Sequence, residues 1–509
     1  MTKGHRCPFH YARDGVSLPD YDCVSLTMPD TETKTIEQLP EAETTAGQVT
    51  LWTAVRESVR GGHHHDYTRG PIGRSIILLA IPMVLEMCME SVFAVVDIFW
   101  VAHLGPGAIA TVGLTESLLT LMYTVAIGLG IGATAMVARR IGEKDPDGAA
   151  RAAVQAIGLG LILSVVFAVL GITFARQLMQ LMDAPPWVLE HGVSFTRIMF
   201  GTNAVILLLF LINAIFRGAG DAAIAMRVLW LANAINIVLG PCFIFGLGPF
   251  PELGVAGAAV ATSIGRGTGV VYAFSKLIRS GGRFDIRREH VRLEPKIMRT
   301  LLRLSATAMF QVFIGMASWI GLIRTISMFG ANALAGYTIG VRVLVFALLP
   351  SWGVANAAAT MVGQALGAGK PERAEKAVWI AGFYNMICLG FVGLMFVIFT
   401  RQIIGLFTDD PNVVYYGVDC LRIVAYGFLF YAYGMVITQS FNGAGDTWTP
   451  TIINLFVFWV WELPLAYVLA FVFGFGPRGV FLAIMIAFST LAIISALVFR
   501  RGKWKTRVV

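Results

Sequence analysis

Charge is scarce in this chain: Asp, Glu, Lys and Arg make up 14% of its 509 residues, whereas hydrophobic residues make up 56%. An average soluble domain carries about 25% charged residues, so a soluble protein of this length would have too little polar surface. The sequence also lacks the alternation over about ten residues that marks strands of a membrane barrel. These deficits exclude a soluble globular protein and leave a helical membrane protein.

Motifs that hold metals or form disulfides are also missing. None of the six cysteines stands in a CxxC pair, so free thiols are expected. No HExxH motif or other ligand pair occurs in the apolar segments, which argues against a membrane-embedded metalloenzyme. His63, His64 and His65 could bind a metal, but three adjacent side chains cannot all point one way, so we interpret them as part of a polar linker.

Long apolar segments recur from about residue 76 onward, and most can cross a hydrocarbon layer of about 30 Å, which takes about 20 helical residues. We therefore predict an all-α integral membrane protein with twelve transmembrane helices. The expected spans are about 76–101, 108–138, 150–175, 192–215, 223–247 and 254–278, followed by 301–326, 333–363, 376–400, 414–440, 449–473 and 479–499.

The second half of the chain repeats the first at an offset of 225 residues. Matching pairs include Gly105 and Gly330, Ala133 and Ala358, Pro146 and Pro371, Phe216–Asp221 and Phe441–Asp446, and Gly254-Val255 and Gly479-Val480. Six spans per unit is an even number, so both units start on the same side and form a parallel repeat. Two matching bundles with a cavity between them are typical of transporters rather than of most membrane enzymes.

These observations divide the chain into four parts: a polar N-terminal tail (1–70), an N-lobe (71–289), a C-lobe (290–500) and a basic tail (501–509). Lys and Arg gather in alternate loops, and the connector 276–303 alone holds nine of them. The positive-inside rule places these loops and both termini in the cytoplasm, in a cell (inner) membrane. The net charge of +8 is thus a topology signal, and we expect a monomer with no nucleic-acid partner.

Three acids interrupt the first span: Glu86, Glu90 and Asp97. At about 100° per residue, Glu90 and Asp97 are turned only about 40° and 20° from Glu86, so the three share one narrow stripe. A carboxylate in mid-bilayer costs at least about 2.5 kcal/mol, so this stripe should face the protein interior or a wet cavity. Burial favours the neutral form of a carboxyl group, which suits it to bind and release a proton.

The alternative is that these acids only bond to neighbouring helices or to Arg197, Arg266 and Arg342. At the offset of 225 the three acids fall on Gln311, Gly315 and Leu322, so a coupling ion is expected in the first half. Glu116 and Glu462 are isolated acids that either line a cavity or lie near an interface. The FRGAGD and FNGAGD segments are interpreted as tight structural turns between helices.

Several segments together resemble the multidrug and toxic compound extrusion (MATE) transporters, over residues 71 to about 500. They are the duplicated GAxA…G…AxxMV…G…P loops, the F-[RN]-GAGD turns, the VVDIFW end of the first span and Asn236-Ile237-Val238-Leu239. The resemblance implies two six-helix bundles related by a pseudo-twofold axis along the membrane normal. It also implies export of cationic or amphipathic organic compounds in exchange for H⁺ or Na⁺, with no cofactor beyond the coupling ion.

The resemblance also implies a coupling-ion site at Asp97, Asn236 and Thr262. Gly240 stands where relatives often carry Asp or Asn, so one oxygen ligand is missing. Na⁺ needs several oxygens and a proton needs one carboxylate, so the departure favours H⁺ unless Glu86, Glu90 or Glu116 fills the gap. Some relatives use an acid in helix 7, where this chain offers only Gln311. The substrate cavity is expected to include Glu86, Glu90, Glu116 and Gln311.

The function expected from the resemblance is an antiporter that exports organic cations and drugs by alternating access. A flippase for lipid-linked precursors, built on the same two lobes, is the alternative. Flippases of this type commonly carry extra helices and a more cationic cavity, so twelve helices with acids in the first argue against it. An enzyme is not expected.

Overall fold

The computed structural model describes residues 56–59, 65–279, 284, 286–292 and 294–507, all within one compact unit that spans 49–509. The described residues form helices and connecting turns, with no strand among them. His63 and His64 lie outside the described residues, and His65 bonds to Glu57 over 2.8 Å. Among the described residues no group of three or more His, Cys, Asp or Glu could hold a metal ion.

Each half of the chain supplies six spans. In the first half they are α2 (Ile72–Ala102), α3 (Pro106–Gly142), α4 (Pro146–Leu181), the pair α6 (Val193–Gly201) and α7 (Asn203–Ala219), α8 (Ala222–Phe245) and α9 (Val255–Ile278). In the second they are α10 (Pro295–Ser327), α11 (Ala331–Gly367), α12 (Pro371–Gly405), the pair α13 (Pro411–Tyr426) and α14 (Phe428–Gly443), the stretch Trp448–Val472 and α17 (Pro477–Arg500).

Nine described helices are long and apolar enough to cross a membrane, and the two pairs, bent by 45° and 60°, bring the number to eleven. The twelfth span is α9, which packs along α8 and is rich in Gly, Ser and Thr. The short helix α5 (Pro186–His191) precedes α6. The stretch Trp448–Val472 consists of α15 (Trp448–Asn454), η2 (Leu455–Glu462), α16 (Leu463–Tyr467) and η3 (Val468–Val472), of which η2 and η3 are π-helical.

The internal repeat is confirmed by the places where helices begin. Helices α3, α4, α5 and α7 start 225 residues before α11, α12, α13 and α14, respectively. The residue before α3 and α11 is a glycine in the same unusual conformation, with φ 95° and ψ 176° at Gly105 and φ 98° and ψ 171° at Gly330. Only glycine adopts such a positive φ readily, so the matching glycines mark the same tight turn in both lobes.

The last pair of helices departs from this register. Gly254 precedes α9 with φ 55° and ψ −132°, and its structural equivalent before α17 is Gly476, with φ 59° and ψ −142°, rather than the Gly479 matched in the sequence. The offset there is 222 residues. The eleventh span runs two residues beyond the end expected from α8, and the loop after it is five residues shorter. The longer span contains the π-helical turns, which take more residues per turn than an α-helix.

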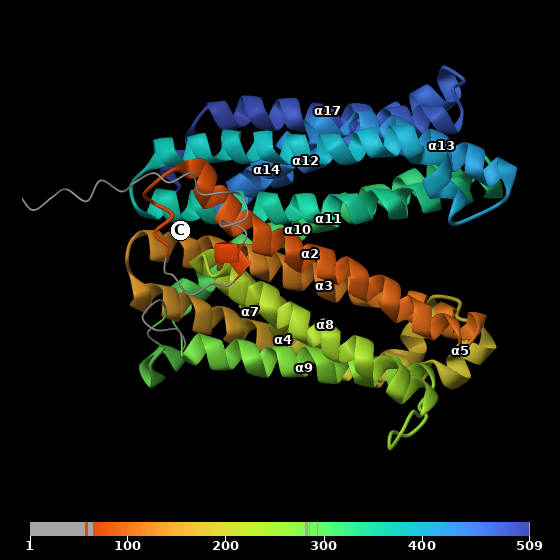
Figure 1. Ribbon diagram of the computed structural model, residues 1–509, viewed down its shortest axis with the longest axis horizontal. Helices are drawn as coiled ribbons and strands as arrows, with labels where there is room; N and C mark the ends of the chain where they lie inside the picture. The colour runs from red at the N-terminus through yellow and green to blue at the C-terminus, as the bar shows by residue number, and fades with distance from the viewer. Residues whose placement is uncertain (1–55, 60–64, 280–283, 285, 293, 508–509) are drawn as a thin grey trace, which may run out of the picture. The chain divides into compact units, whose positions relative to one another are not determined.

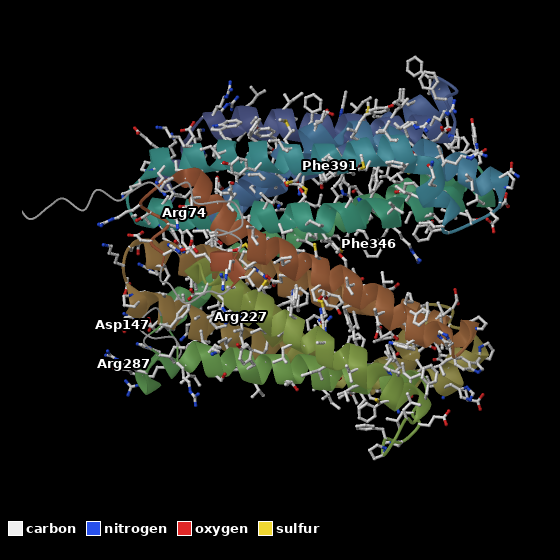
Figure 2. All side chains as sticks on the ribbon, in the orientation of Figure 1. Arg74, Asp147, Arg227, Arg287, Phe346 and Phe391 are labelled. Carbon is white, nitrogen blue, oxygen red and sulfur yellow. The ribbon has the colours of Figure 1, made fainter. Side chains whose placement is uncertain are left out.

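The six helices of each half form one bundle, and the bundles meet where α2 and α3 pack against α11 and α10 (Figure 1). We call the end of the helices that carries loops 143–145 and 368–370 the basic end. Figure 1 shows the bundles converging at this end and diverging toward α5 and α13. In Figure 2, Arg74, Asp147 and Arg287 lie toward the basic end, whereas Phe346 and Phe391 lie along the helices.

The lobes touch closely near the basic end. A Cβ added to Gly142 would lie 2.1 Å from the carbonyl oxygen of Gln364, and one added to Gly367 would lie 2.1 Å from that of Arg139. Hydrogen bonds also cross the interface: the Gln364 amide donates to the Gly218 carbonyl over 3.0 Å, and the Thr360 hydroxyl donates to the Arg217 carbonyl over 3.1 Å. These contacts close the basic end of the inter-lobe space.

Both described chain termini fasten this closure. The Tyr67 hydroxyl donates to the Gly220 carbonyl of the N-lobe over 3.3 Å, while Arg373 of the C-lobe donates to the Tyr67 carbonyl over 3.0 Å. At the other terminus, Arg507 accepts from Arg139 of the N-lobe through its carbonyl and pairs with Asp446 of the C-lobe over 3.3 Å. Each segment thus bridges the two lobes at the basic end.

Candidate functional site

The acidic stripe of α2 faces the interior of the N-lobe. Glu86 is 2% exposed, and its Oε1 accepts a hydrogen bond of 2.6 Å from Nη1 of Arg217. Asn213 lies one helical turn before Arg217 on α7 and donates to the same oxygen over 3.4 Å. A buried carboxylate needs such partners, because an unpaired charge away from water is costly.

Glu90, one turn farther along α2, has partners on two other helices. Its Oε1 accepts from Nη2 of Arg266 on α9 over 3.2 Å, and its Oε2 accepts from Nδ2 of Asn233 on α8 over 3.1 Å. The Arg266 guanidinium also lies 5.5 Å from the ring centre of Phe93. Glu90 therefore joins α2, α8 and α9 in one charged network.

Asp97 lies farther along the same stripe and is half-buried. No hydrogen bond to its carboxylate is found among the described residues, although Glu116 and Arg266 interact with it electrostatically. The predicted partners Asn236 and Thr262 are both buried and bond to each other, from Nδ2 to Oγ1, over 2.7 Å. The coupling role of these three residues remains a prediction.

Gly240 marks the missing ligand at this level. Its nearest neighbour is the Trp100 ring of α2, 3.7 Å from where a Cβ would stand, and Trp100 follows Asp97 by three residues. A longer polar side chain at position 240 would therefore be near the end of α2 that carries Asp97. Glycine supplies no such oxygen.

A cavity of about 280 Å³ lies between the lobes, beside the start of the acidic stripe. Its polar lining includes Glu86, Glu90, Thr134, Asn213 and Arg217 from the N-lobe and Asn356, Thr360, Gln439 and Asn442 from the C-lobe. Its apolar lining includes Met87, Phe210, Leu349 and Trp352. Pockets for drug-sized ligands begin at about 300 Å³, so this space is near the lower limit for such a molecule.

The cavity is built from equivalent positions of the two repeats. Four pairs of lining residues stand 225 apart: Ile127 and Trp352, Ile131 and Asn356, Thr134 and Ala359, and Arg217 and Asn442. The helices α3 and α11, and α7 and α14, thus enclose the space from opposite sides. This arrangement is expected for a cavity on the axis that relates two parallel repeats.

Of the four residues predicted for the cavity, Glu86 and Glu90 line it. Glu116 is exposed on α3 and Gln311 is buried in α10, and neither is among the described residues that line this cavity. Of the arginines considered as partners for the stripe, Arg266 is one, whereas Arg197 is exposed. Arg342 interacts electrostatically with Glu116.

The sequence reasoning missed Arg217 and Asn442. Both lie in the F-[RN]-GAGD segments, which it read as turns alone, yet both line the cavity. The signal was available, because a charged or amide side chain recurs at the same place in two otherwise apolar helices. A polar residue inside a membrane span is a candidate functional residue for that reason.

Two parallel six-helix bundles with an inter-lobe cavity define a two-lobe membrane transporter, and not an enzyme. The MatE family model matches residues 82–242 and again residues 305–468, which together cover more than half of the chain. The chain belongs to the MatE family, and it is a multi-pass membrane protein.

Similar proteins agree with this assignment. The probable multidrug resistance protein YoeA of Bacillus subtilis is 27% identical over 403 residues, covering 78% of this chain and 87% of that protein. An FAD transporter of Shewanella oneidensis is 25% identical over 439 residues, 83% of this chain and 93% of that protein. A solved multidrug resistance MATE family transporter in an outward-facing conformation superposes with a TM-score of 0.81 at 27% identity, covering 89% of this chain and 99% of that one.

Proposed function

We propose that this transporter exports small organic cations and drugs from the cytoplasm in exchange for protons, as a monomer in the cell membrane. The observation that carries the proposal is the acidic stripe of α2. Glu86 and Glu90 stand on the cavity wall, and Asp97 lies farther along the same helix face. One helix therefore links the place where a cargo binds to a carboxylate suited to carry a proton.

The charge of the cavity wall supports a cationic cargo. Two acids, Glu86 and Glu90, and one base, Arg217, line the space, which leaves an excess of negative charge. Met87, Phe210 and Trp352 add polarizable and aromatic surface, which binds amphipathic cations of varied shape. Relatives differ in cargo, since one is an FAD transporter, so the cargo class is argued from this cavity rather than from likeness.

Two features support H⁺ over Na⁺ as the coupling ion. Asp97 offers a carboxylate to which the described residues make no hydrogen bond, and position 240 offers no oxygen beside it. A proton needs only that carboxylate, whereas a dehydrated Na⁺ needs several oxygen ligands. The basic end is closed and is the cytoplasmic end under the positive-inside rule, so the arrangement fits the proton-loading half of an alternating-access cycle.

Reconstituted protein tests this function directly. Proteoliposomes with an imposed H⁺ or Na⁺ gradient and a panel of cationic dyes are expected to show dye movement driven by the H⁺ gradient and stopped by its collapse. Transport driven by Na⁺ alone would contradict proton coupling. Movement of a lipid-linked precursor without dye transport would favour the flippase instead.

Replacing Glu86 by Gln should change cargo preference more than coupling. The change leaves Arg217 as an unpaired positive charge on the cavity wall, so cationic dyes should bind about tenfold more weakly, the factor that ~1.4 kcal/mol produces. The KM for a cationic dye and for a neutral one, measured in proteoliposomes, checks this. Glu86→Asp keeps the charge and is the control. An unchanged KM for the cation in Glu86→Gln would remove Glu86 from cargo binding.

The proposed orientation predicts which loops face the cytoplasm. In a background without the native cysteines, Arg279→Cys at the end of α9 should resist an impermeant maleimide in intact cells, whereas Glu252→Cys in the loop before α9 should react. Both positions are exposed, so accessibility differs only by the side of the membrane. The reverse labelling pattern would invert the proposed topology.

A further inference from the structure

Arg266 is a fixed positive charge inside the N-lobe. It is 4% exposed and lies in the middle of α9, one helical turn after Thr262. Its Nη2 donates to Glu90, whereas its Nε and Nη1 are buried and have no hydrogen-bond partner among the described residues. A guanidinium stays charged under all physiological conditions, so this cation is present in every state of the cycle.

Several polar groups surround this guanidinium. From α2 it meets Glu90 and Asp97, from α3 Tyr123, and from α8 Asn233 through the shared Glu90. Glu116 of α3 is nearby, but its strongest attraction is to Arg342 of the C-lobe. The groups that balance Arg266 are therefore the two carboxylates of α2.

We propose that Arg266 is the resident cation of the coupling site: it excludes Na⁺ and leaves room for a single proton on Asp97. This inference rests on the proposed function and names the residue that decides the ion. Two carboxylates and one guanidinium leave one excess negative charge, which one proton on Asp97 neutralises. A Na⁺ ion beside Asp97 would meet the positive charge of Arg266 without water to screen it.

The unpaired edge of the guanidinium supports this role. Buried Nε and Nη1 donors are costly when unsatisfied, so they are available to a carboxylate that loses its proton. Asp97 lies two turns from Glu90 along the stripe, and the structure gives it no other hydrogen bond from the described residues. Arg266 thereby supplies the deprotonated Asp97 with the partner that Na⁺ supplies in an ion-binding site.

Sodium binding to the purified full-length protein tests the inference without transport. Thermal unfolding is followed in detergent with NaCl or with choline chloride at equal ionic strength. Wild-type protein should unfold at the same temperature in both salts. Arg266→Met should unfold several degrees higher in NaCl, because Na⁺ then binds beside Asp97, and Asp97→Asn combined with Arg266→Met should lose that shift.

Two further variants guard against a folding defect in Arg266→Met, which leaves Glu90 unpaired. Glu90→Gln with Arg266→Met removes the whole ion pair and should still respond to Na⁺, whereas Arg266→Lys keeps the charge and should not. A Na⁺ shift in the wild type, or none in either variant that lacks the arginine, overturns the inference. Proteoliposome transport is scored separately: dye export that fails with this Na⁺ pattern intact rejects the proposed function alone.

Discussion

Asp97→Asn should fold and reach the membrane but lose proton-driven dye efflux, down to the leak of liposomes without protein. The amide has the shape of the protonated acid and cannot release a proton, so the cycle stops in one of its states. Glu86 and Glu90 do not replace it, since both are already paired with arginines. Dye efflux under an imposed pH gradient, with thermal unfolding to confirm the fold, measures the effect.

Two variants sharpen this result. Asp97→Glu keeps an ionisable group on the same helix face and should retain part of the efflux. Glu116→Gln removes the other acid that interacts electrostatically with Asp97, and it should leave coupling largely intact. If Asp97→Asn transports dye at the wild-type rate down a proton gradient, the coupling role passes to another acid, with Glu116 the first candidate.

The sequence predicts most of the fold, because membrane spans and duplications are patterns within the chain itself. Apolar length gives the spans, and matching glycines and prolines give the repeat. The register of the last helix pair was wrong in sequence for a physical reason. A π-helical turn lengthens the eleventh span and a shorter loop follows, and the identity of Gly254 and Gly479 conceals both changes.

The site was predicted only in part, because periodicity orients a side chain without naming its partner. Helical spacing placed Glu86 and Glu90 on one inward face, and the structure has them there. Their partners Arg217 and Arg266 lie 131 and 176 residues away, on helices whose rotation depends on packing. Nothing in the spacing of α2 distinguishes these two arginines from Arg197 or Arg342.

Alternating access requires the lobes to separate at the basic end and to meet again there. The meeting surface is built from small residues: Gly142 and Gly367 lie against the backbone of the opposite lobe, and Gly363 lies against Ala138. The side-chain bonds from Gln364 and Thr360 and the bridging termini add to this contact. Glycine is needed at positions 142 and 367, because no side chain fits between two backbones at that distance.

Gly367→Val should therefore abolish transport while the protein still folds. Its Cβ would lie 2.1 Å from the Arg139 carbonyl oxygen, and backbone on both sides cannot yield, so the lobes must stay apart at the basic end. The clash is between lobes and leaves the packing within each lobe intact. Spin labels at Glu143→Cys and Glu372→Cys, exposed positions on opposite lobes, should report a longer distance than in the wild type.

Gly158→Val is the matched control, since a Cβ on Gly158 of α4 meets nothing within 4 Å. Both changes place a β-branched residue in a long helix, and both carry the same loss of helix propensity. Only Gly367→Val should stop dye efflux and widen the distance between the labels. Gly142→Val repeats the test from the N-lobe side, where the added Cβ would lie 2.1 Å from the Gln364 carbonyl oxygen. Wild-type efflux in either inter-lobe variant would mean that the cycle does not pass through the closed contact seen here.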